Sequence, residues 1–161
     1  MWRFCTYKPE ETHRFGRILG QFAPAGLCIA LTGELGAGKT LFSQGMAEGL
    51  EVEEQVTSPT FTIADQYFSG RLPFVHMDLY RLADADEAWE RGIYEYFDGE
   101  AVVLVEWPQI MLDDLPEDRL DIDIKRRLDD DGAEWREIEI TVHGEHKWLE
   151  EALAYGENLI S

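Results

Sequence analysis

The pattern G-x-x-x-x-G-K-[ST] is matched at every fixed position by Gly33-Glu34-Leu35-Gly36-Ala37-Gly38-Lys39-Thr40. An apolar run, Gly26–Thr32, precedes this stretch, and a segment suited to a helix, Thr40 to about Leu50, follows it. A strand, a glycine-rich turn and a helix in that order are the context in which such a loop cradles phosphate groups. The sequence therefore predicts a phosphate-binding loop near its N-terminal end.

The residue types in this loop fit a triphosphate nucleotide. Glycines let backbone N–H groups approach phosphate oxygens without a Cβ in the way, and the following helix adds the positive end of its dipole. We expect all eight residues, 33–40, to contribute to nucleotide binding, with Lys39 at the β- and γ-phosphates and the Thr40 hydroxyl on Mg²⁺. The N-K-x-D motif for guanine is absent, because Asn158 is the only asparagine, and this favours ATP.

Two acidic residues follow apolar strands and are candidates to help hold Mg²⁺. Asp78 ends the run Phe74–Asp78, and Glu106 ends the run Val102–Glu106. An acid at the end of a strand beside the phosphate loop contacts the metal ion in many nucleotide-binding proteins. Either carboxylate could touch the ion directly or through water, or could orient the attacking water, and both alternatives stay open at this point.

The order of the remaining patterns predicts an α/β fold. Its expected elements are a helix over Pro9–Phe22, a hairpin of Phe61–Phe68 and Leu72–Met77, a helix over Asp84–Phe97, a buried strand Ala101–Val105, two half-exposed strands, Leu120–Ile124 and Ile138–Val142, and a last helix from His146 to about Tyr155. We expect a P-loop NTPase-like three-layer fold in one domain, residues 1–161. Its mixed sheet would have a parallel core and added antiparallel strands.

Composition narrows the function further. The 161 residues include 14 Lys+Arg and 33 Asp+Glu, a formal net charge of −19, which disfavours direct binding to nucleic acid or anionic lipid. No apolar run is long enough to span a membrane, and the segment Met1–Thr6 does not resemble a secretory signal. Two cysteines make no disulfide framework, so we expect reduced thiols and a cytoplasmic protein.

Four motifs together resemble the bacterial TsaE (YjeE) family. They are the loop Gly33–Thr40, then Thr57-Ser58-Pro59-Thr60-Phe61, then His76-Met77-Asp78-Leu79-Tyr80-Arg81-Leu82, then Val105-Glu106-Trp107-Pro108, in the family's order and rough spacing. The likeness extends over about residues 6–145. It departs from the family at Glu34, where Asp is common, and in the connection Lys125–Trp135, which matches no pattern that we can assign.

The resemblance implies a small P-loop ATPase that is needed for threonylcarbamoyl-adenosine formation in tRNA. Members of this family bind the TsaD–TsaB complex and reset it by ATP hydrolysis, so tRNA would be met only through that complex and no membrane is involved. On this likeness Lys39, Asp78 and Glu106 would be catalytic, and Thr40 and both acids would serve the metal. Residues 57–60, with Thr60 at the nucleotide, would form a switch loop, and Trp107 would lie beside the nucleotide.

Two other functions are compatible with the phosphate loop. A small-molecule P-loop kinase would need an arginine-bearing lid, and no segment of this chain has the pattern of one. A nucleotide-bound scaffold would change shape but hardly hydrolyse. Substitution of Lys39 separates these possibilities, because only a scaffold that works without nucleotide would survive loss of ATP binding.

Overall fold

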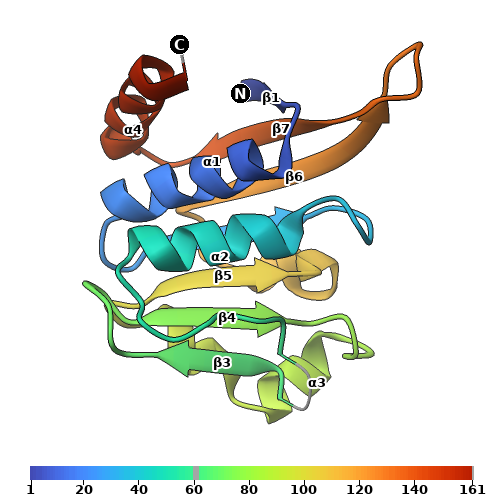
Figure 1. The fold of residues 1–161 in the computed structure, drawn as a ribbon. Coiled ribbons are helices and arrows are strands. Elements are labelled where there is room, and N and C mark those ends of the chain that lie inside the picture. The colour runs from blue at the N-terminus through green and yellow to red at the C-terminus, as the bar shows by residue number, and fades with distance from the viewer. Residues whose placement is uncertain (60–61, 161) are drawn as a thin grey trace.

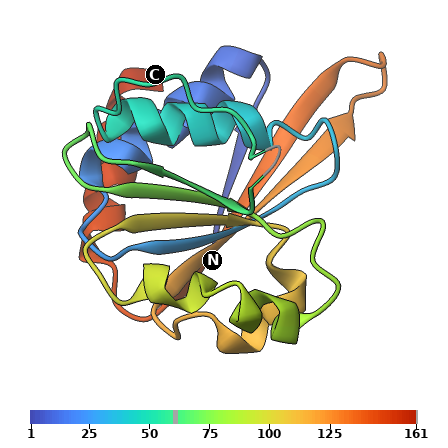
Figure 2. The same cartoon turned by 90° about the horizontal axis from the view of Figure 1, so that it is seen from below.

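A seven-stranded sheet lies between two layers of helices in the computed structural model, which describes residues 1–59 and 62–160 (Figure 2). One face carries the helices α1 (Pro9–Phe22), α2 (Lys39–Gly49) and α4 (Lys147–Ile160), and the other carries α3 (Ala85–Glu90) and the 3-10 helices η1 (Ile93–Phe97) and η2 (Pro108–Asp114). The predicted three-layer α/β architecture is therefore confirmed. No helix among the described residues combines the length and apolar character that a bilayer crossing requires.

The sheet is mixed, as predicted. Its strands are β1 (Trp2–Thr6), β2 (Cys28–Thr32), β3 (Ala64–Tyr67), β4 (Phe74–Asp78), β5 (Val102–Glu106), β6 (Arg119–Leu128) and β7 (Glu134–His143). They lie in the order β1-β7-β6-β2-β5-β4-β3 (Figure 1). The four central strands, β6, β2, β5 and β4, are parallel, whereas β3, β7 and β1 are antiparallel to their neighbours. The carboxyl ends of β2, β4 and β5 therefore meet at one edge of the sheet.

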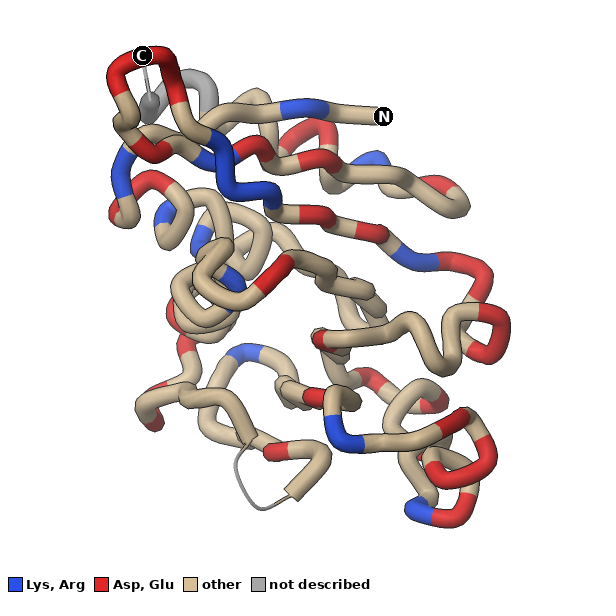
Figure 3. Tube along the Cα trace, turned by 90° about the vertical axis from the view of Figure 1, so that its right-hand side faces the viewer, with Lys and Arg blue, Asp and Glu red and all other residues tan. Residues whose placement is uncertain are grey.

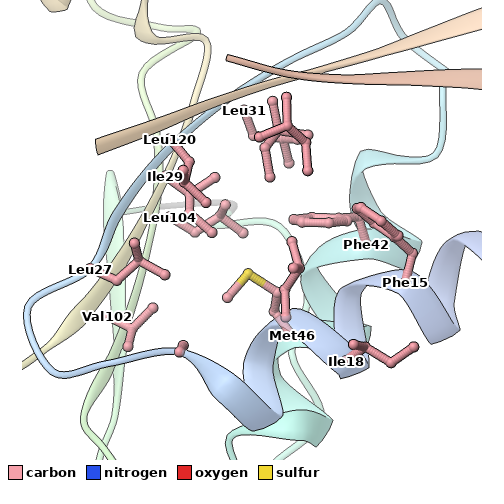
Figure 4. Close-up of a cluster of buried hydrophobic side chains, with 14 of the residues drawn as sticks. Phe15, Ile18, Leu27, Ile29, Leu31, Phe42, Met46, Val102, Leu104 and Leu120 are labelled. Atoms are coloured by element: carbon pink, nitrogen blue, oxygen red, sulfur yellow. The ribbon is translucent and has the colours of Figure 1, made fainter. Parts of the chain in front are cut away.

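The burial of each strand follows from its sequence pattern. All five residues of β5 are buried, because helices cover both faces of the sheet there. In β6, only alternate residues are buried, among them Ile122 and Ile124, because that strand has one face toward the core. The core on the α1 and α2 side includes Phe15, Phe42 and Met46, whose side chains point from the helices toward β2 (Figure 4).

Helices α1 and α2 approach each other closely through glycines. A Cβ built on Gly45 would lie 2.1 Å from the carbonyl oxygen of His13, and one on Gly49 would lie 2.1 Å from that of Arg17. Gly16 faces Phe42 in the same way, with a distance of 2.3 Å. The backbones of the two helices are thus in contact along the middle and the end of α2.

Several segments differ from the sequence-based expectations. The single helix predicted over Asp84–Phe97 is wrong, because Gly92 adopts φ 71° and divides it into α3 and η1. Asp84 caps α3 by accepting a hydrogen bond from the Glu87 N–H. The edge strand β1 was not predicted. The segment 125–135 extends β6 and β7 into a hairpin with a turn at Asp129–Gly132. Phe61, assigned to the start of a strand, lies outside the described residues.

Candidate nucleotide-binding site

The phosphate loop joins β2 to α2 at the carboxyl edge of the sheet. Gly36 has φ 80° and Gly38 has φ 110°, conformations that a residue with a Cβ rarely adopts. Gly38 is also the N-terminal cap of α2, and the Ala37 N–H donates to the Glu34 carbonyl oxygen at 3.1 Å, which closes a turn. The first N–H groups of α2 have no carbonyl within the helix to bond, so they are available to an anion.

Lys39 is the first residue of α2, and its side chain is only 7% exposed. Its Nζ lies 4.0 Å from Oε1 of Glu106 and 4.0 Å from the centre of the Trp107 indole ring. Burial lowers the pKa of Lys39, and the negative charges of Glu106 and Asp78 act in the opposite direction. The ammonium group is thus held between the Glu106 carboxylate and the Trp107 ring, beside the phosphate loop.

Asp78 and Glu106 are register partners at the ends of the parallel strands β4 and β5. Glu106 is buried, and its Oε2 lies 2.5 Å from Nε2 of His76, which is also buried. Asp78 is half-buried, and its Oδ1 accepts a hydrogen bond from the Tyr80 N–H at 3.0 Å. The sheet topology therefore brings together two acids that lie 28 residues apart in the sequence.

A cavity of about 410 Å³ opens over the phosphate loop. This size is within the range of small-molecule sites. Its lining includes these residues singled out by the sequence: Leu35, Gly36, Gly38, Lys39, Thr40, Ser58, Asp78, Glu106 and Trp107. Gly33, Glu34 and Ala37 belong to the loop but not to this lining, and Thr60 lies outside the described residues.

One wall of the cavity consists of residues that sequence reasoning missed. They come from the end of β1, the start of α1 and the start of β7: Thr6, Tyr7, Lys8, Pro9, Thr12, Glu134, Trp135 and Arg136. Tyr7 and Trp135 line this space, and their ring centres lie 6.3 Å apart. Tyr7 and Trp135 belong to no local sequence motif. Only the pairing of β1 with β7 brings them together.

The donor atoms of the cavity are compatible with Mg²⁺. The Thr40 hydroxyl and the carboxylates of Asp78 and Glu106 are hard oxygen ligands, and all three residues line the same space. Among residues 1–59 and 62–160, no cluster of three or more His, Cys, Asp or Glu side chains forms a metal site by itself. Mg²⁺ at this position would thus need phosphate oxygens to complete its ligand shell, as is usual for this ion.

Comparisons with known proteins identify relatives of this chain. Residues 6–137 match the family model described as threonylcarbamoyl adenosine biosynthesis protein TsaE. A Bacillus subtilis protein named tRNA threonylcarbamoyladenosine biosynthesis protein TsaE is 45% identical over 159 residues, which cover 98% of this chain and 96% of that relative. A Treponema pallidum protein of the same name is 37% identical over 76% of this chain and 90% of its own length. The crystal structure of Bacillus subtilis YdiB superposes with a TM-score of 0.76 at 38% identity, covering 99% of this chain and 96% of that one.

Proposed function

The chain belongs to the TsaE family of threonylcarbamoyladenosine biosynthesis proteins, and from this membership we propose that it is a Mg²⁺-dependent ATPase. Its family role is in the biosynthesis of threonylcarbamoyladenosine in tRNA. The observation that carries the ATPase proposal is that Lys39, Thr40, Asp78 and Glu106 line one cavity at the N-terminus of α2. On this proposal, residues 1–161 act as one ATPase domain.

The lining residues of the cavity support a nucleotide bound at the carboxyl edge of the sheet. The triphosphate would lie on the loop and the start of α2, where free N–H groups and the helix dipole favour negative charge. The base would extend toward Tyr7 and Trp135, which offer aromatic faces at the opposite wall. An adenine ring can stack on such faces, and the chain lacks the sequence motif that guanine specificity commonly uses.

Hydrolysis needs a fixed γ-phosphate and an oriented water molecule. Lys39 would leave the carboxylate and the indole ring that hold it and bind the β- and γ-phosphates. Asp78 and Glu106 would together bind the metal ion and orient the attacking water. Mg²⁺ bound with the nucleotide would draw negative charge from the phosphate oxygens. The bond from the γ-phosphorus to the bridging oxygen breaks as water adds, giving ADP and inorganic phosphate.

The partners that we propose are the TsaD and TsaB proteins, with ATP hydrolysis resetting their complex. Acidic residues occur along most of the chain (Figure 3), and the net charge is −19. Such a surface repels the phosphates of tRNA, so contact with tRNA would pass through the partner proteins. The predicted cytoplasmic location, inferred from the two unpaired cysteines, remains a prediction.

Calorimetry and phosphate release test this function directly. The wild-type protein should bind ATP with Mg²⁺ and release inorganic phosphate slowly alone, and at a changed rate with TsaD and TsaB. Lys39→Ala should abolish binding, and Asp78→Ala or Glu106→Ala should lower turnover more than binding. Absence of nucleotide binding by the folded wild-type protein would refute the proposal.

Two further results would point to other functions. Transfer of the phosphate to a metabolite would identify a kinase. Unchanged support of tRNA modification by the Lys39→Ala variant would leave a scaffold.

A metal-binding titration with Mn²⁺ in place of Mg²⁺, in the presence of ADP, tests which acid binds the metal directly. The direct ligand is the one of Asp78 and Glu106 whose substitution by alanine weakens Mn²⁺ binding.

A further inference from the structure

The side chain of Arg136 reaches from β7 to the phosphate loop and binds its backbone. Nε of Arg136 donates to the carbonyl oxygen of Ala37 at 2.7 Å, and Nη2 donates to that of Gly36 at 3.1 Å. The residues in contact are 99 and 100 positions apart in the sequence. The side chain of Arg136 is only 20% exposed, so much of its surface is packed in this position.

These two hydrogen bonds determine which way the loop's peptide groups face. In a trans peptide, the C=O and the N–H of one unit point in opposite directions. Because the guanidinium binds the carbonyls of Gly36 and Ala37, the N–H groups of Ala37 and Gly38 point away from it. The Ala37 N–H closes the turn to Glu34, whereas the Gly38 N–H remains directed away from the guanidinium.

The guanidinium also removes a repulsion from the site. Carbonyl oxygens carry partial negative charge, and two of them turned into the cavity would repel a phosphate. The planar fork of an arginine presents several N–H donors in fixed directions, so it suits two neighbouring carbonyls better than a single ammonium group does.

The position of Arg136 itself is set by the sheet. Its backbone is paired with Thr6 of β1 on one side and with Arg126 of β6 on the other. Its Nη2 also lies 3.5 Å from Oε2 of Glu134, a carboxylate that Arg126 binds through the other oxygen. The backbone of Arg136 is thus paired with both neighbouring strands, and its guanidinium is held by Glu134 of the same strand, which Arg126 of β6 binds in turn.

We propose that Arg136 is a positioning residue that holds the phosphate loop in its nucleotide-binding conformation before the nucleotide arrives. A loop that is already ordered loses less conformational entropy on binding, so affinity rises without any added contact to the ligand. The proposal rests on the proposed nucleotide-binding function, and it concerns the order of the loop rather than the chemical step.

The first test uses no nucleotide. In hydrogen exchange of the full chain, Arg136→Gln should raise the exchange rate of the Ala37 amide, which is bonded to the Glu34 carbonyl oxygen, about tenfold, while amides of β2 and β5 stay unchanged. Arg127→Gln is the matched control, since Arg127 lies on the same hairpin and pairs with Glu137 instead of the loop. Its loop exchange should equal that of the wild type. Equal loop exchange in Arg136→Gln and wild type would overturn the proposal.

The second test measures how loop order affects binding. Arg136→Gln should raise the Kd for Mg-ADP about tenfold, which corresponds to about 1.4 kcal/mol, and should raise KM for ATP more than it lowers kcat. Arg136→Lys keeps the charge but loses the fork, so it should give intermediate loop exchange and affinity. This variant also serves if the Gln variant does not fold.

The remaining outcomes separate the proposal from its alternatives. Wild-type affinity in Arg136→Lys would mean that Arg136 acts as a simple charge toward phosphate, and would overturn the proposal. Faster loop exchange with unchanged Kd would also overturn it. If the wild-type protein bound no nucleotide, the proposed function would fail, whereas the exchange experiment would still decide whether Arg136 orders the loop.

Discussion

His76 Nε2 lies 2.5 Å from Oε2 of Glu106, and both side chains are excluded from solvent. Two atoms with only lone pairs would repel at this distance, so a proton lies between them. The other carboxylate oxygen of Glu106 lies 4.0 Å from Lys39 Nζ. Glu106 is therefore held from two sides at the floor of the cavity, and neither holding group comes from its own strand.

Removal of the imidazole should affect both stability and rate. His76→Leu leaves the buried Glu106 carboxylate without its closest partner, and we expect a loss of about 1–3 kcal/mol in the free energy of unfolding. We also expect a larger fall in kcat than in ATP affinity, because the carboxylate would lose its orientation. His76→Gln, whose amide N–H can still donate, should recover part of both. Urea unfolding and phosphate release measure the two effects, and wild-type values for the Leu variant would contradict the inference.

The contact between Lys39 and Trp107 provides an optical signal for nucleotide binding. If the ammonium leaves the indole face to bind phosphate, the surroundings of Trp107 change and its fluorescence should change with them. Titration with Mg-ADP should therefore alter the emission of the wild-type protein. Trp107→Phe should lose most of this change, whereas Trp89→Phe, on the exposed surface of α3, should retain it. A change retained in the Trp107 variant would exclude this contact as its source.

The sequence predicts local elements well where a physical signal marks both ends. Helix α1 has the predicted bounds, because Pro9 suits a first turn and Pro24 prevents continuation. The expected long helix at 84–97 fails because apolar spacing continues past Gly92, while the backbone there turns into the left-handed region. Periodicity reports which side chains face the core, but it does not report where the helical hydrogen bonds stop.

The candidate site likewise has one part that the sequence predicts and one part that it does not. The sequence predicts the phosphate loop because phosphate binding requires particular residues at fixed spacing. The sequence does not predict the part of the cavity lined by Tyr7, Trp135 and Arg136, because those residues meet only through the register of β1 and β7 at the edge of the sheet. That register depends on the whole fold, so a pattern within one segment cannot encode it.

The close packing of α1 on α2 predicts a large cost for one added methyl group. Gly45→Ala would bring a Cβ within 2.1 Å of the His13 carbonyl oxygen, and the helices would have to separate. We expect a loss of about 1–3 kcal/mol despite the better helix propensity of alanine. Gly156→Ala in α4 is the control, because its Cβ would meet only side-chain atoms of Ile18, the nearest at 3.2 Å, and no backbone. Denaturant unfolding should distinguish the two, and equal stability would contradict the contact.

The buried thiol of Cys28 should make stability depend on pH in the alkaline range. Burial raises the pKa of Cys28 from 9.0 to about 12, with Arg119 lowering it and Asp121 raising it to smaller extents. Between these values the unfolded chain releases the thiol proton and the folded chain keeps it, so the unfolded state binds fewer protons and stability falls as pH rises. The contribution is complete below pH 9 and declines by about 1.4 kcal/mol per pH unit above it.

Cys28→Val isolates this contribution from those of the other alkaline groups, because valine has no proton to release. The free energy of unfolding of the wild type minus that of the variant should be constant below pH 9 and should fall above it. The exposed Cys5 thiol should react readily with a thiol reagent at pH 8, whereas Cys28 should react only after unfolding, since a protonated and buried thiol is a poor nucleophile. A difference between wild type and variant that stays flat from pH 8 to pH 11 would mean that the folded protein exposes Cys28 to water.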